Sequence, residues 1–182
     1  MLSKLQLRTR RSTSIALFAA LMTLAPVGVF AQSPEQSSFL ADAFKRVVFD
    51  PTTYAPAVVA YDATVRDWKS SQVFFRNGYF ENNGRFTISG RPDDVPISYA
   101  AGRNRILIDA LINLQLSVVN NVADQVFEGM LANRFPDHRR LVRTLGWMER
   151  ISFASFMSYK LSEAHYRQAA ENIARARQLG FR

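Results

Sequence analysis

Residues 103–133 read RNRILIDALINLQLSVVNNVADQVFEGMLAN, a run without proline in which the one glycine is Gly129. Apolar residues recur in it three and four positions apart, which is the repeat of one helix face. Polar residues follow an opposing stripe. Because about thirty helical residues span roughly 45 Å, we expect this helix to be the spine of the domain. The apolar stripe is Leu107, Leu111, Leu114, Val118, Val122, Val126 and Met130, and the polar stripe is Asp109, Asn113, Asn120, Asp124 and Glu128.

Two helices are predicted before the spine. Apolar residues repeat along residues 34–48, and Asp50-Pro51 ends that helix because a residue before proline is pushed out of the helical region. A second helix is predicted from about Pro56 to Ser70, with Pro56 in its first turn, where proline's missing N–H is not needed.

Two further helices are predicted after the spine. Asp137 is a suitable N-cap for a helix that runs to about Tyr159. Ser162 then caps a fifth helix, from Glu163 to about Gln178, and Gly180 ends it. The fourth helix carries one predicted face that consists of Leu141, Leu145, Met148, Ser152, Ser155 and Tyr159.

Residues 71–105 have a different composition, rich in glycine, asparagine, arginine and aromatic residues. Asn83-Gly84 is a strong signal for a two-residue hairpin turn, which predicts that Glu81 pairs with Phe86 and Tyr79 with Ile88. The sequence therefore predicts a mainly α domain over residues 32–182: a four- to five-helix bundle around one long central helix, with a small β-hairpin or loop insertion at about residues 71–105.

The N-terminal 31 residues have the pattern of a secretory signal peptide. Residues 1–13 are basic, residues 14–30 are mostly apolar, and Val29-Phe30-Ala31 resembles a signal-peptidase site. An uncleaved membrane anchor is the alternative, although the apolar run is near the minimum for crossing a bilayer. We expect export through the inner membrane, to the periplasm or the outside.

About half of the net positive charge of the chain lies in this N-terminal segment. The full sequence of 182 residues has 23 basic and 15 acidic side chains, a net charge of +8. Without residues 1–31 it keeps 19 basic and 15 acidic groups, a net of +4. This modest charge, the expected export and the lack of any RNP, helix-turn-helix or zinc-finger pattern argue against a nucleic-acid partner.

The chain contains no cysteine. An exported protein without cysteine has no residue for lipid attachment at the cleavage site and forms no disulfide. Thiol chemistry, cysteine-bound zinc and Fe–S clusters are excluded for the same reason.

No familiar catalytic or cofactor motif is present, so we expect a non-enzymatic protein without metal or cofactor. The sequence lacks a GxSxG motif, and His138 and His165 are far apart, which favours surface or capping roles for both. The serines at positions 152, 155 and 158 suit a close helix–helix approach, with a polar groove as the alternative.

Candidate binding residues concentrate in and beside the predicted loop region. Gly102, Arg103 and Arg105 precede the long helix, where they suit either an anion site or ion pairs with Asp93, Asp94 or Asp109. The arginine excess over lysine suits a binding surface or reflects codon composition. The full candidate set is Arg76, Arg85, Arg91, Asp93, Asp94, Tyr99, Arg103 and Arg105.

The first functional hypothesis is an exported binding protein for a partner protein, an envelope polymer or a membrane surface, with the contact region expected between Phe74 and Arg105. The second is a carrier of hydrophobic small molecules with a cavity between the third and fourth helices. The third is an enzyme whose site combines Asp93, Asp94, Arg103 and Tyr99.

Overall fold

A computed structural model describes residues 34–181. The signal peptide expected at residues 1–31 lies outside them. The described part contains four α-helices and two short 3₁₀ helices, and no β-strand. The α-helices are α2 (Pro34–Phe49), α3 (Pro51–Arg76), α4 (Tyr99–Arg134) and α5 (Arg139–Gln178), and the 3₁₀ helices are η1 (Gly84–Phe86) and η2 (Pro136–His138).

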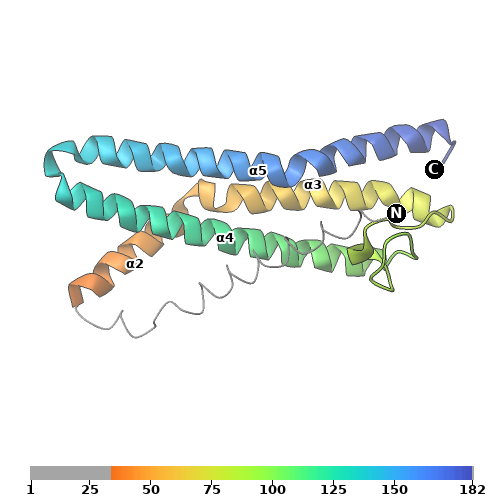
Figure 1. The fold of residues 1–182 in the computed structure, drawn as a ribbon, viewed down its shortest axis with the longest axis horizontal. Helices are drawn as coiled ribbons and strands as arrows, with labels where there is room; N and C mark the ends of the chain where they lie inside the picture. The colour runs from red at the N-terminus through yellow and green to blue at the C-terminus, as the bar shows by residue number, and fades with distance from the viewer. Residues whose placement is uncertain (1–33, 182) are drawn as a thin grey trace, which may run out of the picture. The chain divides into compact units, whose positions relative to one another are not determined.

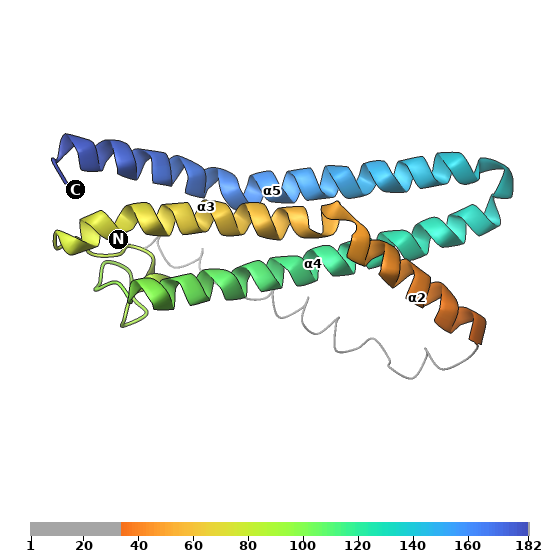
Figure 2. The same cartoon turned by 180° about the vertical axis from the view of Figure 1, so that it is seen from behind.

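Residues 42–181 form one compact unit, and residues 34–41 belong to a separate one, so the boundary lies within α2. Within the larger unit α3 contacts both α4 and α5 over much of its length, whereas α4 and α5 contact each other less. Figures 1 and 2 show α3 between the other two, with α4 running in the opposite direction to both. The central helix is thus α3 and not the long helix that the sequence analysis expects at the centre.

Small side chains allow α3 and α5 to pack closely. The buried residues of α3 include Ala57, Ala60 and Ala63, and the face that α5 buries consists mainly of small residues: Gly146, Ala154, Ser162, Ala169 and Ala176. Ser152 and Ser155, which the sequence analysis expects to serve a close helix approach, are exposed instead.

An aromatic core joins α3 to the loop of residues 77–98 and to the start of α4. Trp68, Phe86 and Ile106 are buried together, and Tyr61, Val65, Phe75 and Ile97 pack around them. The indole N–H of Trp68 donates a hydrogen bond to the carbonyl oxygen of Tyr99 at 3.1 Å. This core holds the loop against the first turn of α4.

The predicted hairpin is wrong. Asn83 has φ −87° and its side chain accepts a hydrogen bond from the N–H of Arg85, so the chain enters η1 rather than a type I′ turn. The structure instead has two isolated bridges, one between Glu81 and Asp94 and one between Thr87 and Pro96. The expected pairs were Glu81 with Phe86 and Tyr79 with Ile88. The hydrogen bond of the Asn83 side chain to the nearby backbone therefore stabilises a 3₁₀ turn in place of the hairpin turn that Asn-Gly favours.

Several helix boundaries also differ from the prediction. The break at Asp50-Pro51 is confirmed, but α3 begins at Pro51 with Asp50 as its N-cap, and Pro56 lies inside the helix. The predicted fourth and fifth helices are one helix, α5, in which Ser162 is a buried interior residue. Asp137 lies in η2 and makes no cap for α5, whose N-cap residue is His138. Gly180, with φ +70°, follows the end of α5 as expected.

Candidate functional site

The outward side of α4 is apolar over most of the helix. Between Leu107 and Met130 every residue with a highly exposed side chain is uncharged, and Gln115 is the one polar member. Its six large side chains are each between 49% and 60% exposed. We call this set the outer face of α4: Leu107, Ile108, Leu111, Ile112, Gln115, Ala123, Phe127 and Met130.

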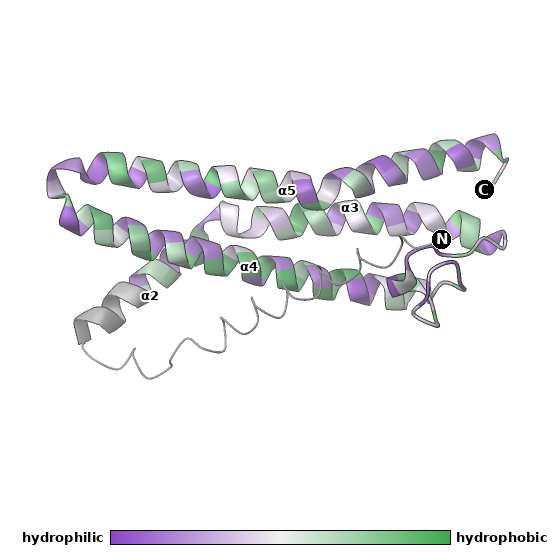
Figure 3. Cartoon of the chain, in the orientation of Figure 1, coloured by the Kyte–Doolittle hydropathy of each residue, from purple (hydrophilic) through white to green (hydrophobic). Residues whose placement is uncertain are grey.

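The outer face is long and has two exposed groups, residues 107–115 and residues 123–130, with half-buried or buried residues between them. Its residues occupy one side of the helix, and from Leu107 to Met130 the helix rises about 35 Å. In Figure 3 hydrophobic residues recur along the whole length of α4, whereas the C-terminal half of α5 is mostly hydrophilic. A face of this size exceeds the scattered apolar residues that are ordinary on a protein surface and marks an interaction site.

Length and composition make α4 the helix among residues 34–181 that meets the criteria for a membrane span. Helices at the core of soluble proteins meet the same criteria, but such helices are mostly buried. In α4 22% of the apolar window is buried. Its apolarity is therefore not explained by burial against the rest of residues 34–181.

Arginines flank the outer face at both of its ends. Arg103 and Arg105 precede it, and Arg134, Arg140 and Arg143 surround the turn that follows. No carboxylate in residues 41–181 lies within ion-pair distance of these five side chains. The apolar face thus ends in positive charge on either side.

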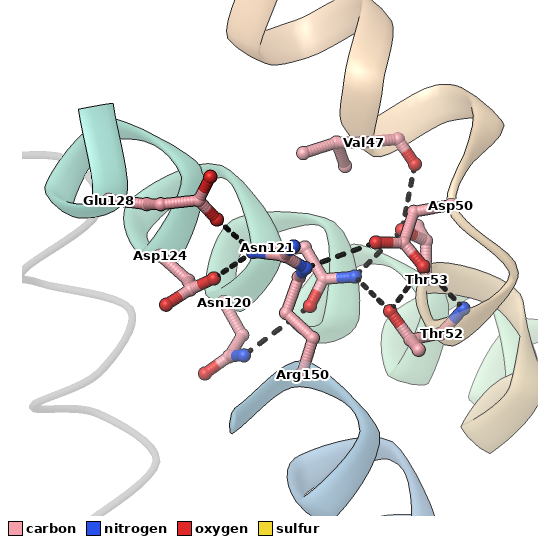
Figure 4. Close-up of polar contacts among 9 residues, drawn as sticks. All are labelled: Val47, Asp50, Thr52, Thr53, Asn120, Asn121, Asp124, Glu128 and Arg150. Atoms are coloured by element: carbon pink, nitrogen blue, oxygen red, sulfur yellow. Dashed lines mark hydrogen bonds and ion pairs between the residues drawn. The ribbon is translucent and has the colours of Figure 1, made fainter. Parts of the chain in front are cut away.

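The inner face of α4 is polar and is held by a buried hydrogen-bond network (Figure 4). Arg150 of α5, 5% exposed, donates from Nε to Asp50 at 3.1 Å and from Nη1 to Glu128 at 3.0 Å, and also to Asp124. The Asn121 amide donates to the hydroxyls of Thr52 and Thr53 at 3.0 and 2.8 Å. We call these seven residues the Arg150 network: Asp50, Thr52, Thr53, Asn121, Asp124, Glu128 and Arg150.

Three carboxylates share one guanidinium in this network. Burial opposes the charge on Arg150, but its hydrogen bonds to Glu128 and Asp124 outweigh that cost and raise its pKa. Burial raises the pKa of Asp124, and the hydrogen bond from Arg150 only partly compensates. Arg150 therefore stays charged and ties polar groups of α4 to α5 and to the N-terminus of α3.

Two glycines fix how α4 and α5 approach their neighbours. A Cβ on Gly102 would lie 2.3 Å from the Trp68 ring, and a Cβ on Gly146 would lie 2.6 Å from Oε2 of Glu128. Gly102 therefore brings α4 against the aromatic core, and Gly146 leaves room for Glu128 to reach Arg150. Together with the Arg150 network, these contacts orient α4 with its polar side inward and its apolar side outward.

The predicted stripes of α4 do not match its buried and exposed sides. Leu107, Leu111 and Met130 of the predicted apolar stripe are exposed and its other members are half-buried, whereas Glu128 of the polar stripe is buried. The same holds at the start of α5, where Leu141, Leu145 and Met148 of the predicted face are exposed.

The eight candidate binding residues do not form one cluster. Arg76 ends α3, Arg91 and Asp93 are exposed in the loop, and Tyr99 begins α4 and gives its carbonyl oxygen to Trp68. Asp93 has φ +58°, a left-handed conformation that aspartate tolerates in turns.

Two pairs among the eight interact electrostatically, Arg91 with Asp94 and Tyr99 with Arg103. Arg85 pairs with Asp109 of α4. Hydrogen bonds from Ser89 and from the backbone of Val95 lower the pKa of Asp94, whose backbone pairs with Glu81.

The Arg103–Arg105 region makes none of the ion pairs that the sequence analysis weighs. Nη2 of Arg103 donates to the hydroxyl of Tyr61 at 3.0 Å, a hydrogen bond that raises the arginine pKa. Asp109, the acid expected to pair with these arginines, is held by Arg85.

A second feature is a half-open cleft of about 540 Å³ between α3, residues 79–86 and α5. Nδ1 of His165 lies 2.8 Å from Oδ2 of Asp67 within its lining. Sequence reasoning missed this pair because the residues lie 98 positions apart. The hypothesis of a hydrophobic carrier expects a cavity between the helices of residues 103–133 and 137–159, which is a different place.

The described residues contain no group of histidines and carboxylates arranged to hold a metal ion. Comparisons with known proteins give no relative: no family model, no curated protein and no solved structure matches the chain. Function is therefore argued from the outer face of α4 and from the cleft.

Proposed function

We propose that this is an exported, non-enzymatic protein that binds the surface of an anionic membrane through the outer face of α4. The observation that carries the proposal is that every highly exposed residue between Leu107 and Met130 is uncharged, and that six of these are large apolar side chains. Export rests on the signal-peptide pattern of residues 1–31. The location would be the periplasm or the outside, where a membrane surface is within reach.

An amphipathic helix that binds a membrane lies in the interface with its apolar residues below the headgroups. Arginines beside it reach lipid phosphates, and each basic group near an anionic surface adds about 1 kcal/mol. The arginines at both ends of the outer face, such as Arg103 and Arg140, suit this arrangement because phosphates would meet them at either end.

A second copy of the chain fits the same face less well. The outer face has arginines at both ends, so two copies would bring like charges together whether α4 pairs with α4 in the parallel or the antiparallel direction. A negatively charged lipid surface complements both ends at once. Charge complementarity therefore selects the membrane as the partner.

Vesicle co-sedimentation tests the proposal with the chain that begins at Gln32. We expect binding to vesicles that contain phosphatidylglycerol, weaker binding to pure phosphatidylcholine, and release at high salt. The double variant Leu111→Gln/Ile112→Gln should weaken binding at least about tenfold, because two half-exposed side chains lose their apolar contact. Arg140→Ala/Arg143→Ala should reduce the preference for the anionic lipid.

Matched controls are exposed apolar residues elsewhere. Val58→Gln on α3 and Ile173→Gln on α5 should leave vesicle binding unchanged, since both are exposed apolar residues of other helices. Equal loss in the control variants would show that binding is not specific to α4. If the protein forms a dimer in solution and does not bind vesicles, the proposal is overturned, and the outer face of α4 is then a contact between two copies of the chain.

A further inference from the structure

The half-open cleft between α3, residues 79–86 and α5 is a second candidate binding feature, separate from the outer face of α4. Its volume of about 540 Å³ is within the range of small-molecule sites. Three segments far apart in the sequence form it: α3 from Thr64, the loop to Phe86, and α5 from His165 to Arg175. Much of its wall comes from the stretch that the sequence analysis expects to carry binding.

Neutral polar side chains dominate the hydrogen-bonding groups of the cleft. Amides and hydroxyls both donate and accept hydrogen bonds, which is what a ligand rich in hydroxyl groups requires. Asn172 is already oriented, because its amide donates to Ser71 at 3.0 Å and to Ser70 at 3.1 Å. The neutral polar lining consists of Thr64, Ser71, Asn82, Asn83, Gln168 and Asn172.

The charged groups of the cleft are largely engaged. His165 contacts one oxygen of Asp67 at 2.8 Å. Burial raises the pKa of Glu81, although its carboxylate accepts a hydrogen bond from the N–H of Asn83 at 2.7 Å. Both carboxylates therefore have a partner within the chain, and the lining combines two acidic side chains with the basic Arg175. This mixed charge favours a neutral ligand over a strongly ionic one.

Aromatic rings supply the apolar part of the wall. Trp68 and Phe74 are buried and act as structural support, whereas Phe80 is 64% and Tyr79 40% exposed at the loop. An exposed ring beside amides and hydroxyls contacts the C–H face of a sugar while the polar groups bind its hydroxyls.

We infer that the cleft binds a short segment of a neutral glycan. The aromatic ring of Phe80 packs on a sugar face, and the amide of Asn82 binds sugar hydroxyls. Asn172 supports the wall of the cleft, because Ser70, Ser71 and Gln168 already bind its amide. Fatty acyl chains fit poorly, because polar groups line much of the wall and would lose their water without gaining a partner. The inference is independent of the membrane proposal, since no residue of the outer face of α4 lines the cleft.

Calorimetric titration of the purified protein with maltotriose, cellotriose and N,N′,N″-triacetylchitotriose tests the inference. We expect saturable binding of at least one trisaccharide. Phe80→Ala should weaken it about tenfold through loss of the ring contact, and Asn82→Ala should weaken it as well. Both residues are exposed, so unfolding midpoints should remain those of the unchanged protein.

Phe156→Ala is the matched control, because Phe156 is exposed on α5 outside the cleft. It should bind the trisaccharide within twofold of the unchanged protein, about the precision of such titrations. The absence of saturable binding for all three sugars would overturn the inference, as would unaltered binding by Phe80→Ala. Choline and laurate serve as an organic cation and a fatty acid, and saturable binding of either in place of the sugars would also overturn it.

Discussion

The two halves of α4 are held by opposite kinds of contact. Its N-terminal half packs Gly102 and Ile106 against the aromatic core around Trp68. Its C-terminal half turns Asn121, Asp124 and Glu128 toward Arg150 and the start of α3. The outward side is nevertheless apolar along both halves.

This difference shows that the orientation of α4 does not follow from its own hydrophobic stripe. In the first half the orientation depends on close apolar packing, and in the second on the satisfaction of buried charge. Because both contacts act on the same side of the helix, they reinforce each other, and a substitution in either half measures how much that half contributes.

The largest effect is expected from Arg150→Met. The substitution leaves Asp50, Asp124 and Glu128 without their common cation while all three are largely buried. Breaking such a group typically costs about 3–5 kcal/mol. Urea unfolding measures the change in the free energy of unfolding.

Arg167→Met is the control for this prediction. Arg167 is exposed and pairs with Glu163 at 3.5 Å one turn away on α5, so its loss should cost less than about 0.5 kcal/mol. Equal destabilisation by the two variants would mean that the Arg150 network adds nothing beyond an ordinary surface pair.

The same substitution in each half sharpens the comparison. Gly102→Ala forces a methyl group against the Trp68 ring, which other aromatic rings hold in place, and we expect a loss of about 1–3 kcal/mol. Gly146→Ala meets the carboxylate of Glu128 at 2.6 Å and makes only an ordinary contact with Arg150 at 3.4 Å. The end of the flexible Glu128 side chain is able to shift, which weakens its hydrogen bond to Arg150, while alanine favours the helix by about 1 kcal/mol.

Gly146→Ala should therefore destabilise the protein less than Gly102→Ala. Thermal unfolding of both variants gives the order, and tryptophan fluorescence should change mainly in Gly102→Ala, next to Trp68. The reverse order would indicate that the Arg150 network is the more rigid of the two regions.

The smallest effect is expected for Glu81, near the aromatic half. Burial raises its pKa, so the folded protein holds this proton more tightly than the unfolded chain does. This carboxyl consequently destabilises the fold once it ionises, and stability returns as pH falls through the raised pKa. Glu81→Gln should be slightly more stable than the unchanged protein at neutral pH, with the difference disappearing below the ordinary glutamate pKa.

Urea titrations of both proteins across this pH range measure the difference between their free energies of unfolding. The contributions of the other titrating groups cancel in this difference because both proteins share them. A difference that does not vary with pH would contradict the pKa direction for Glu81. NMR titration of the side-chain carboxyl provides the direct check.

Features that depend on neighbouring residues could be predicted from the sequence. The break at Asp50-Pro51 and the glycine at position 180 follow from local backbone restrictions. The hairpin prediction failed because Asn83 caps η1 with its own side chain. Ser162 was misread as a cap because a small residue inside a helix contact has the same local appearance.

The candidate site was less accessible to sequence reasoning. Arg150 meets Asp50 across 100 positions of the chain, and Asn121 meets Thr53 across 68. The periodic polar residues of α4 were visible in the sequence, but nothing local told whether they faced water or Arg150. Pairing of Asp67 with His165 across the cleft was hidden for the same reason.

The sequence by itself determined that the described chain is mainly helical and that α4 has one apolar and one polar side, because helix period, caps and prolines act over a few residues. The tertiary structure decided which side turned inward. The buried Arg150 of α5 needs carboxylate partners, and the Trp68 ring of α3 leaves no room for a side chain at position 102. Both contacts hold the same side of α4 against its neighbours, so the apolar side faces the surface.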